Sequence, residues 1–93
     1  MRKIFKYKFK IESNVRINMP VNSEILKVGL DGDGQPCIWA LVYPEQSIDS
    51  RDFLVFATGE EFSWGRDWVL FLDTIIMPDG LVWHIFERRL KLH

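Results

Sequence analysis

The sequence predicts an all-β protein: a small antiparallel sandwich or partly open barrel of about seven strands, with at most one short helical turn. Apolar and polar residues alternate at a period of two in several segments, and turn-forming residues recur roughly every 8–12 positions. No stretch longer than about ten residues keeps a helical period without fitting a strand better. At 93 residues the chain has room for one hydrophobic core, so we expect a single domain over 1–93.

The N-terminal segment is the clearest strand. Aromatic and aliphatic side chains alternate with lysines along it, in the order Phe5, Lys6, Tyr7, Lys8, Phe9, Lys10 and Ile11. This period of two is typical of a strand with one buried and one solvated face. A turn-prone stretch at 12–14 leads into a second alternation at 15–19, which Pro20 ends. We therefore expect residues 4–19 to form a hairpin.

A second hairpin is expected around the turn Asp31-Gly32-Asp33-Gly34, which joins an alternating segment at 26–30 to a return strand at 37–43. The return strand is apolar at every position, as is the segment 53–57. Continuous apolar strands are covered on both faces, so we expect these two to be central. The polar stretch 44–51 between them is expected to be a loop.

The C-terminal third is expected to begin with a loop at 60–65 that has room for one helical turn. A third hairpin follows, with strands at 68–77 and 81–86 joined by the turn Pro78-Asp79-Gly80.

Charge is unevenly distributed along the chain. Twelve basic and thirteen acidic residues give a net charge of −1, which argues against a general nucleic-acid-binding protein. The first ten residues include five basic ones and the last six include three, and neither stretch contains an acid. If the first and last strands lie side by side, they form a basic band on an acidic body that would attract an anionic ligand or partner. The alternative is that the lysines protect an edge strand against aggregation.

Residues that usually carry chemistry are few. His84 is the single histidine inside the chain and no serine lies in a G-x-S-x-G motif, so we expect a hydrogen-bonded structural histidine. The alternative is a hydrolase built around His84 and a loop carboxylate. Cys37 is expected to be an inert packing thiol. Common phosphate-binding, dinucleotide-binding and zinc motifs are absent from the sequence, so we predict no cofactor, no metal and no enzymatic activity.

Aromatic residues are the least ordinary feature of the composition, with four Trp, seven Phe and two Tyr. Most are expected in the core, where large rings supply the burial that a small fold needs. Trp64 differs because it lies in a loop beside Phe62 and Arg66. These three residues are candidates to anchor a partner protein or to stack on a base. The alternative is that Trp64 folds back and plugs one end of a barrel.

Five landmarks spread over nearly the whole chain resemble a family of short uncharacterised phage and prophage proteins. They are Ile4-Phe5-Lys6-Tyr7, Met19-Pro20 followed by Glu24-Ile25-Leu26, Pro36-Cys37-Ile38-Trp39-Ala40-Leu41-Val42, Phe56-Ala57-Thr58-Gly59 and Val82-Trp83-His84-Ile85-Phe86-Glu87. The basic tail 88–93 extends past the usual ending of that family. The resemblance implies a viral accessory protein in the cytoplasm of a bacterial host, and it supplies no mechanism and no catalytic residues. The lysines near the N-terminus, where a signal peptide would be apolar, also favour a cytoplasmic location.

We therefore expect a small phage-type accessory binding protein, without enzymatic activity, that blocks or sequesters a host component. The partner would be a host protein complex involved in defence, or its anionic nucleotide signal, and not a membrane. The basic residues expected to bind the anionic element are Lys6, Lys8, Lys10, Arg88 and Arg89. The anchoring residues are Phe62, Trp64 and Arg66. The alternative is a structural assembly module that forms homo-oligomers, since one small sheet cannot bury apolar strands on both faces by itself.

Overall fold

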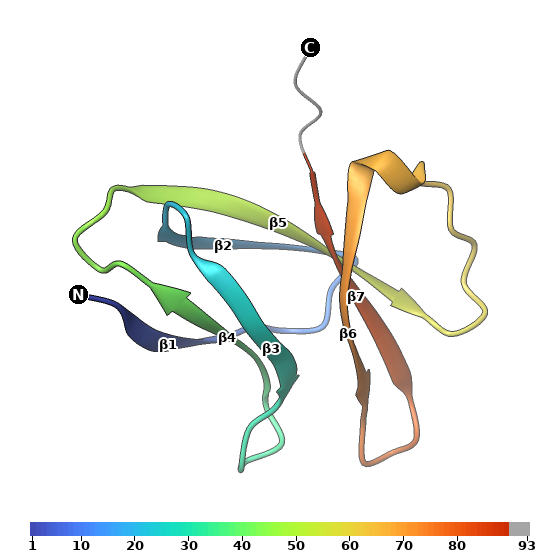
Figure 1. Cartoon of the computed structure of the whole chain (residues 1–93). Helices are drawn as coiled ribbons and strands as arrows, with labels where there is room; N and C mark the ends of the chain where they lie inside the picture. Colours follow the sequence, from blue (N-terminus) through green and yellow to red (C-terminus); the bar gives the residue numbers. More distant parts are fainter. Residues whose placement is uncertain (90–93) are drawn as a thin grey trace.

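The computed structural model describes residues 1–89 and is drawn in Figure 1. Its strands are β1 (Lys3–Lys8), β2 (Asn14–Pro20), β3 (Glu24–Leu30), β4 (Pro36–Val42), β5 (Ile48–Ala57), β6 (Val69–Ile76) and β7 (Val82–Arg88), and its one short 3-10 helix is η1 (Arg66–Trp68). The prediction of an all-β fold with at most one helical turn is confirmed. Within residues 1–89, no helix is long and apolar enough to cross a membrane.

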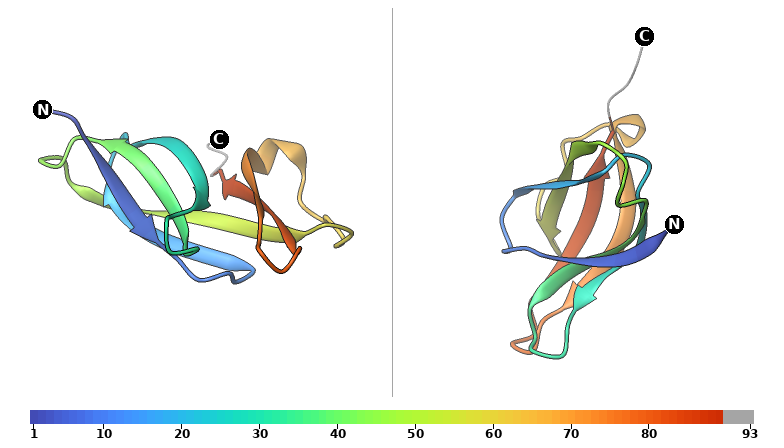
Figure 2. Two further views of the ribbon diagram at one scale, coloured as in Figure 1. Left: turned by 90° about the horizontal axis from the view of Figure 1, so that it is seen from below. Right: turned by 90° about the vertical axis from the view of Figure 1, so that its left-hand side faces the viewer.

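All strand pairs are antiparallel and form two sheets. Sheet A has the order β1-β4-β3, and sheet B has the order β2-β5-β7-β6. The sheets meet where β3 lies beside β6, but they share no backbone ladder, so the fold is a sandwich and not a closed barrel. Figure 2 shows β5 running along the length of the molecule and joining the two halves of sheet B.

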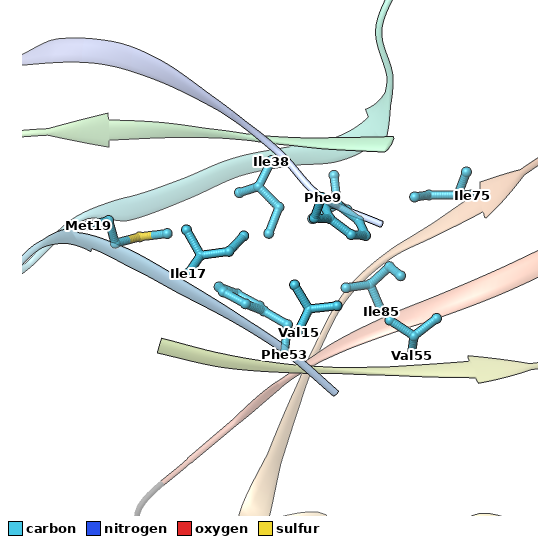
Figure 3. Packing of buried hydrophobic residues seen from close by; sticks show 10 residues of the cluster. Phe9, Val15, Ile17, Met19, Ile38, Phe53, Val55, Ile75 and Ile85 are labelled. Carbon is cyan, nitrogen blue, oxygen red and sulfur yellow. The ribbon is translucent and has the colours of Figure 1, made fainter. Parts of the chain in front are cut away.

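One hydrophobic core lies between the sheets. Inward side chains of both sheets and of the β1–β2 connection form it, as Figure 3 shows from close by. Its buried members are Phe9, Val15, Ile17, Met19, Val28, Ile38, Phe53, Val55, Ile75 and Ile85. Along β2 and β5 these residues occupy alternate positions, as the period of two requires.

The predicted hairpin over residues 4–19 is wrong. β1 pairs with β4 in sheet A, whereas β2 pairs with β5 in sheet B. The chain crosses between the sheets at Phe9, whose side chain is buried in the core and whose N–H donates to the Pro36 carbonyl at 3.0 Å. Alternation identifies the buried face of a strand but not its neighbour, so the pattern fits a crossing as well as a hairpin.

The other two predicted hairpins are confirmed as β3–β4 and β6–β7, and β4 and β5 are central strands. The segment 44–51 is only partly a loop, because β5 begins at Ile48. Its first residues have exposed polar side chains, but their backbone pairs with β2, for example in the register Met19↔Asp49. The polar side chains of 48–51 therefore led to the prediction of a loop where the longest strand begins. The helical turn expected within 60–65 follows that stretch, as η1.

A carboxylate ties the two sheets together where β3 and β6 meet. Asp73 accepts hydrogen bonds from the Val28 N–H at 3.2 Å and from the Lys27 ammonium at 3.0 Å. Burial opposes the charge of this carboxylate, but hydrogen bonds from Lys27, Thr74 and Val28 outweigh burial and lower the pKa of Asp73. A side chain of β6 thus acts as the acceptor for a backbone N–H at the edge of β3.

A second ion pair holds β5 against β7 inside sheet B. The Arg51 guanidinium donates to both carboxylate oxygens of Glu87, at 2.6 and 2.7 Å, and to the Ser23 carbonyl at 2.5 Å. The Arg51 and Glu87 side chains are 23% and 14% exposed. A bidentate pair in partly buried surroundings is stronger than a surface pair, and removing one partner leaves the other desolvated without its hydrogen bonds.

We predict that Glu87→Ala lowers the free energy of unfolding by about 3 kcal/mol, near the lower end of the range for breaking a buried pair. Arg16→Ala is the matched control, because Arg16 also makes a two-point contact with a carboxylate, that of Asp52, but is 68% exposed. Its effect should be much smaller. Urea denaturation at neutral pH measures both. Equal losses in the two variants would contradict the role of the Arg51–Glu87 pair.

Candidate functional site

The outer face of sheet B carries a cluster of four phenylalanine rings. Phe86 lies at the centre, with its ring centroid 5.8 Å from that of Phe56, 5.1 Å from Phe62 and 5.3 Å from Phe71. Phe71 and Phe86 are register partners on β6 and β7, and Phe56 comes from β5. Ile85, the preceding residue of β7, is buried in the core. Because side chains alternate between the two faces of a strand, Phe86 and its register partner Phe71 point away from the core.

The fourth ring reaches this cluster because the chain turns sharply after β5. Gly59 has a φ of 89°, a backbone conformation that residues with a side chain rarely adopt. The turn is closed by the Glu60 N–H, which donates to the Ala57 carbonyl at 3.1 Å, and by the Ala57 N–H, which donates to the Glu60 carboxylate at 2.9 Å. It returns the following loop over the face of sheet B, where the Phe62 ring lies 4.7 Å from that of Phe56.

Three of these rings, those of Phe62, Phe71 and Phe86, line an open groove, which we call the aromatic groove. Its volume is about 580 Å³, and its lining residues are Phe62, Arg66, Val69, Leu70, Phe71, Phe86 and Arg89. Large apolar side chains are exposed in it: Phe71 is 52% exposed, Leu70 41% and Phe62 40%. Arg66 and Arg89 supply its charged groups. A contiguous exposed apolar surface with a polar rim marks an interaction site.

Trp64 lies beside Arg88, next to the groove-lining Arg89. The guanidinium carbon of Arg88 is 5.3 Å from the centroid of the Trp64 ring, which is a cation–π contact. Trp64 is half-buried and so offers less free surface than Phe62. The structure thus brings the predicted loop residues together with two of the predicted C-terminal arginines.

The predicted lysines lie elsewhere, so the basic band expected from adjacent terminal strands does not form. β1 is an edge strand of sheet A, and β7 lies inside sheet B between β5 and β6. The Lys6 ammonium pairs with the Asp31 carboxylate at 3.2 Å. Lys8 and Lys10 line a separate hollow of about 230 Å³ at β2, together with Arg16. Residues 90–93 of the predicted basic tail lie outside the described residues.

Asp31 organises the β3–β4 turn and holds one of the predicted lysines. Its carboxylate accepts hydrogen bonds from the Gln35 and Asp33 N–H groups and from the Lys6 ammonium. The hydrogen bond from the Gln35 backbone is the largest influence on this group, and the pKa of Asp31 is lowered to about 2. Burial, reinforced by the nearby Asp31 charge, raises the pKa of the Cys37 thiol. The fully buried Cys37 is therefore a protonated packing thiol, as predicted.

His84 is held between two threonines on the outer face of sheet B. Its Nε2 lies 2.8 Å from the Thr58 hydroxyl, and its Nδ1 lies 3.0 Å from the Thr74 hydroxyl. Both ring nitrogens have a hydroxyl partner, so the expectation that His84 is hydrogen-bonded is confirmed. In the described part of the chain, no group of three or more His, Cys, Asp or Glu residues is placed to hold a metal ion.

A second hollow of about 710 Å³, which we call the polar hollow, adjoins the aromatic groove and shares Leu70 and Arg89 with it. Its lining residues are Arg16, Asp49, Ser50, Arg51, Asp52, Leu70, Glu87, Arg88 and Arg89. The Arg16–Asp52 and Arg51–Glu87 pairs neutralise four of its charged side chains. Arg88 and Arg89 then face a single carboxylate, that of Asp49, so the hollow carries an excess of positive charge.

Sequence reasoning missed four members of the aromatic groove: Val69, Leu70, Phe71 and Phe86. They lie in apolar strands that were expected to contribute to the core. A signal was present, since Phe86 neighbours His84 and Arg88 at a spacing of two, which places all three on one face of a strand. In a nearly continuous apolar run, however, the pattern does not say which face is buried.

We predict that Asp31→Asn lowers stability at neutral pH and that the difference from wild type shrinks in acid. The folded-state pKa of Asp31, about 2, lies below its ordinary value of 3.8. The stabilisation by the ionised carboxylate is therefore complete above about pH 4 and is lost as the pH falls through about 2. Thermal unfolding of both proteins between neutral pH and pH 2 measures the difference. A difference that stays constant over this range would contradict the assignment.

One family model matches residues 1–92 of the chain, and its description is a domain of unknown function, DUF7352. No curated protein and no solved structure matches the chain. The family match agrees with the expectation of an uncharacterised family and assigns no activity, so the surfaces described above are the basis for a functional proposal.

Proposed function

The chain belongs to the DUF7352 family of unknown function, and we propose that it is a non-enzymatic binding protein that docks on a partner protein through the aromatic groove. The groove is the single observation that carries the proposal. It combines three exposed apolar side chains, Leu70 and Phe71 from β6 and Phe62 from the preceding loop, with the two arginines Arg66 and Arg89.

The chemistry of the groove suits a protein partner. Aromatic and arginine side chains are enriched at the centres of protein interfaces, where they bury large areas and pair with carboxylates. Phe71 and Phe62 are exposed enough to be buried by a partner, and Arg66 and Arg89 lie beside them. Ring contacts with Phe86 already restrain both phenylalanines, so docking loses little side-chain entropy.

A nucleotide signal is a poorer fit to this surface. Recognition of a base requires polar groups that converge on its edges, in a pocket that covers most of the ligand. The groove is open, and its charged groups belong to two exposed arginines. We therefore propose a protein as the direct partner.

The proposed setting is a bacterial cytoplasm, in which this phage-type accessory protein blocks a host protein complex, for example one used in defence. The support for this setting is the resemblance of five landmarks to phage and prophage proteins. The groove supports blocking over catalysis, because an exposed aromatic surface can cover a partner's surface without reacting with it.

We predict that Phe71→Ser weakens binding of the captured host protein at least tenfold, a change of about 1.4 kcal/mol. Affinity capture from bacterial lysate identifies the partner, and calorimetry with both purified proteins measures the dissociation constant. Ile76→Ser is the matched control, because Ile76 lies on the same strand and is 70% exposed but does not line the aromatic groove. It should bind as wild type does.

Equal binding by wild type and Phe71→Ser would contradict docking in the groove. Titration with cyclic nucleotides and short oligonucleotides is the complementary test. Tight nucleotide binding by a protein that captures no partner would favour the nucleotide alternative.

A homo-oligomeric assembly module is the second candidate function, and exposed apolar residues on two edge strands favour it. Ile4 on β1 is 62% exposed and Ile76 on β6 is 70% exposed. Exposed edges of this kind can pair with another copy of the chain. Light scattering over a range of concentrations distinguishes the two functions. We predict a monomer or dimer, whereas a large ring or array would favour the assembly module.

A further inference from the structure

The aromatic groove is lined by cations but by no carboxylate. Its two charged lining residues are Arg66 and Arg89, and both are exposed. In the described part of the chain, neither guanidinium forms an ion pair with an acidic side chain. Of the acids nearby in sequence, Asp67 does not line the groove, and Glu87 is held by Arg51. The groove therefore offers a partner two positive charges and no negative one.

Both arginines lie at the same end of the groove. The Arg89 N–H donates to the Trp68 carbonyl at 2.7 Å, and Trp68 is the last residue of η1, which begins with Arg66. β6 starts directly after η1, and Phe71 is its third residue. Two residues of a strand span about 7 Å. The groove therefore has a cationic end beside η1 and an apolar part a short step further along β6.

This arrangement restricts which protein segment can cover the groove. Docking removes water from the two guanidinium groups, which is costly unless each gains a partner that accepts its hydrogen bonds. A carboxylate accepts two parallel hydrogen bonds from a guanidinium. The exposed side chains of Phe62, Leu70 and Phe71 need apolar atoms against them for their burial to be favourable. The complementary segment thus carries carboxylates and an apolar side chain within a few residues of each other.

We propose that the aromatic groove selects an acidic segment of the partner protein, whose carboxylates bind Arg66 and Arg89 while a neighbouring aromatic or aliphatic side chain packs against Phe71. The inference rests on the proposed function, because it names the chemistry of the segment that docks there. The two arginines are the specificity-determining residues, and the exposed rings supply the buried area. A basic or uncharged segment would leave both cations without partners.

Selection from a random dodecapeptide library on the immobilised full-length protein tests the inference with a defined probe. Peptides that also bind the Phe71→Ser protein are removed, so that the retained peptides depend on the groove. Asp and Glu should be enriched at least threefold in the retained peptides, within a few residues of an aromatic or aliphatic residue. Retained peptides without this enrichment would overturn the inference.

Titration with one selected peptide measures the contribution of the arginines. Arg66→Gln should raise the dissociation constant about fivefold, because charge-assisted hydrogen bonds are lost from an exposed site. Lys10→Gln is the matched control, since Lys10 is an exposed cation outside the groove and its replacement changes the net charge equally. It should leave the dissociation constant unchanged. Equal constants for the two variants would overturn the inference.

A change in the peptide repeats the test without altering the protein. Replacing its Asp and Glu residues by Asn and Gln should weaken binding at least fivefold. Raising the salt concentration should weaken binding of the acidic peptide more than that of the neutral one. Equal affinities of the two peptides at low salt would overturn selection by charge.

Capture from lysate distinguishes failure of this inference from failure of the proposed function. A captured partner that depends on Phe71 but binds equally well when Arg66 and Arg89 are both replaced by Gln would overturn the acidic segment and leave docking in the groove intact. If acidic peptides depend on Phe71 while no captured protein does, the proposed function fails and the preference of the groove for acidic segments stands.

Discussion

The pairing of β5 with two different strands is the constraint on which the rest of the structure depends. Its first half pairs with β2 and its second half with β7, and the two ladders overlap only at Phe53 and Leu54. β5 is therefore the backbone link between β2 and the β6–β7 hairpin in sheet B. Both surfaces follow from it. The first half of β5 lines the polar hollow, and the turn after the second half brings Phe62 to the aromatic groove.

Side-chain contacts hold these surfaces in place. The Arg51–Glu87 pair fixes β5 against β7 beside the polar hollow, and Phe86 holds the rings of the aromatic groove. Strand residues held in this way need little ordering when a partner binds, whereas Phe62 and Arg66 of the aromatic groove come from the loop and the short helix before β6. The core is completed by Ile75 and Ile85 on the opposite face of the same hairpin. The Phe71 side chain lies outside that core and is exposed, as a binding role requires.

The sequence predicts the elements of this fold better than their arrangement. Turn residues such as Gly34 and Gly80 have positive φ, and they locate two hairpins because that conformation is local. The crossing at Phe9 is not local: its burial depends on Pro36 and on the second sheet, so alternation alone suggested a hairpin. In the aromatic groove, Phe62 and Arg66 could be predicted because they lie in a loop. Phe71 could not, because it lies in an apolar strand, and packing decides which face of such a strand is buried. The separation of Lys6 from Arg88 likewise depends on sheet order.

The central claim is that a partner protein covers the aromatic groove and not the lysine-bearing strand β1. Photo-crosslinking in bacterial lysate tests it most directly, with a benzophenone-bearing phenylalanine placed at Phe71 in one protein and at Lys6 in another. Both positions are exposed, so both probes can reach a bound partner. We expect a specific crosslinked band from position 71 and none from position 6. A band from position 6 alone would contradict the account.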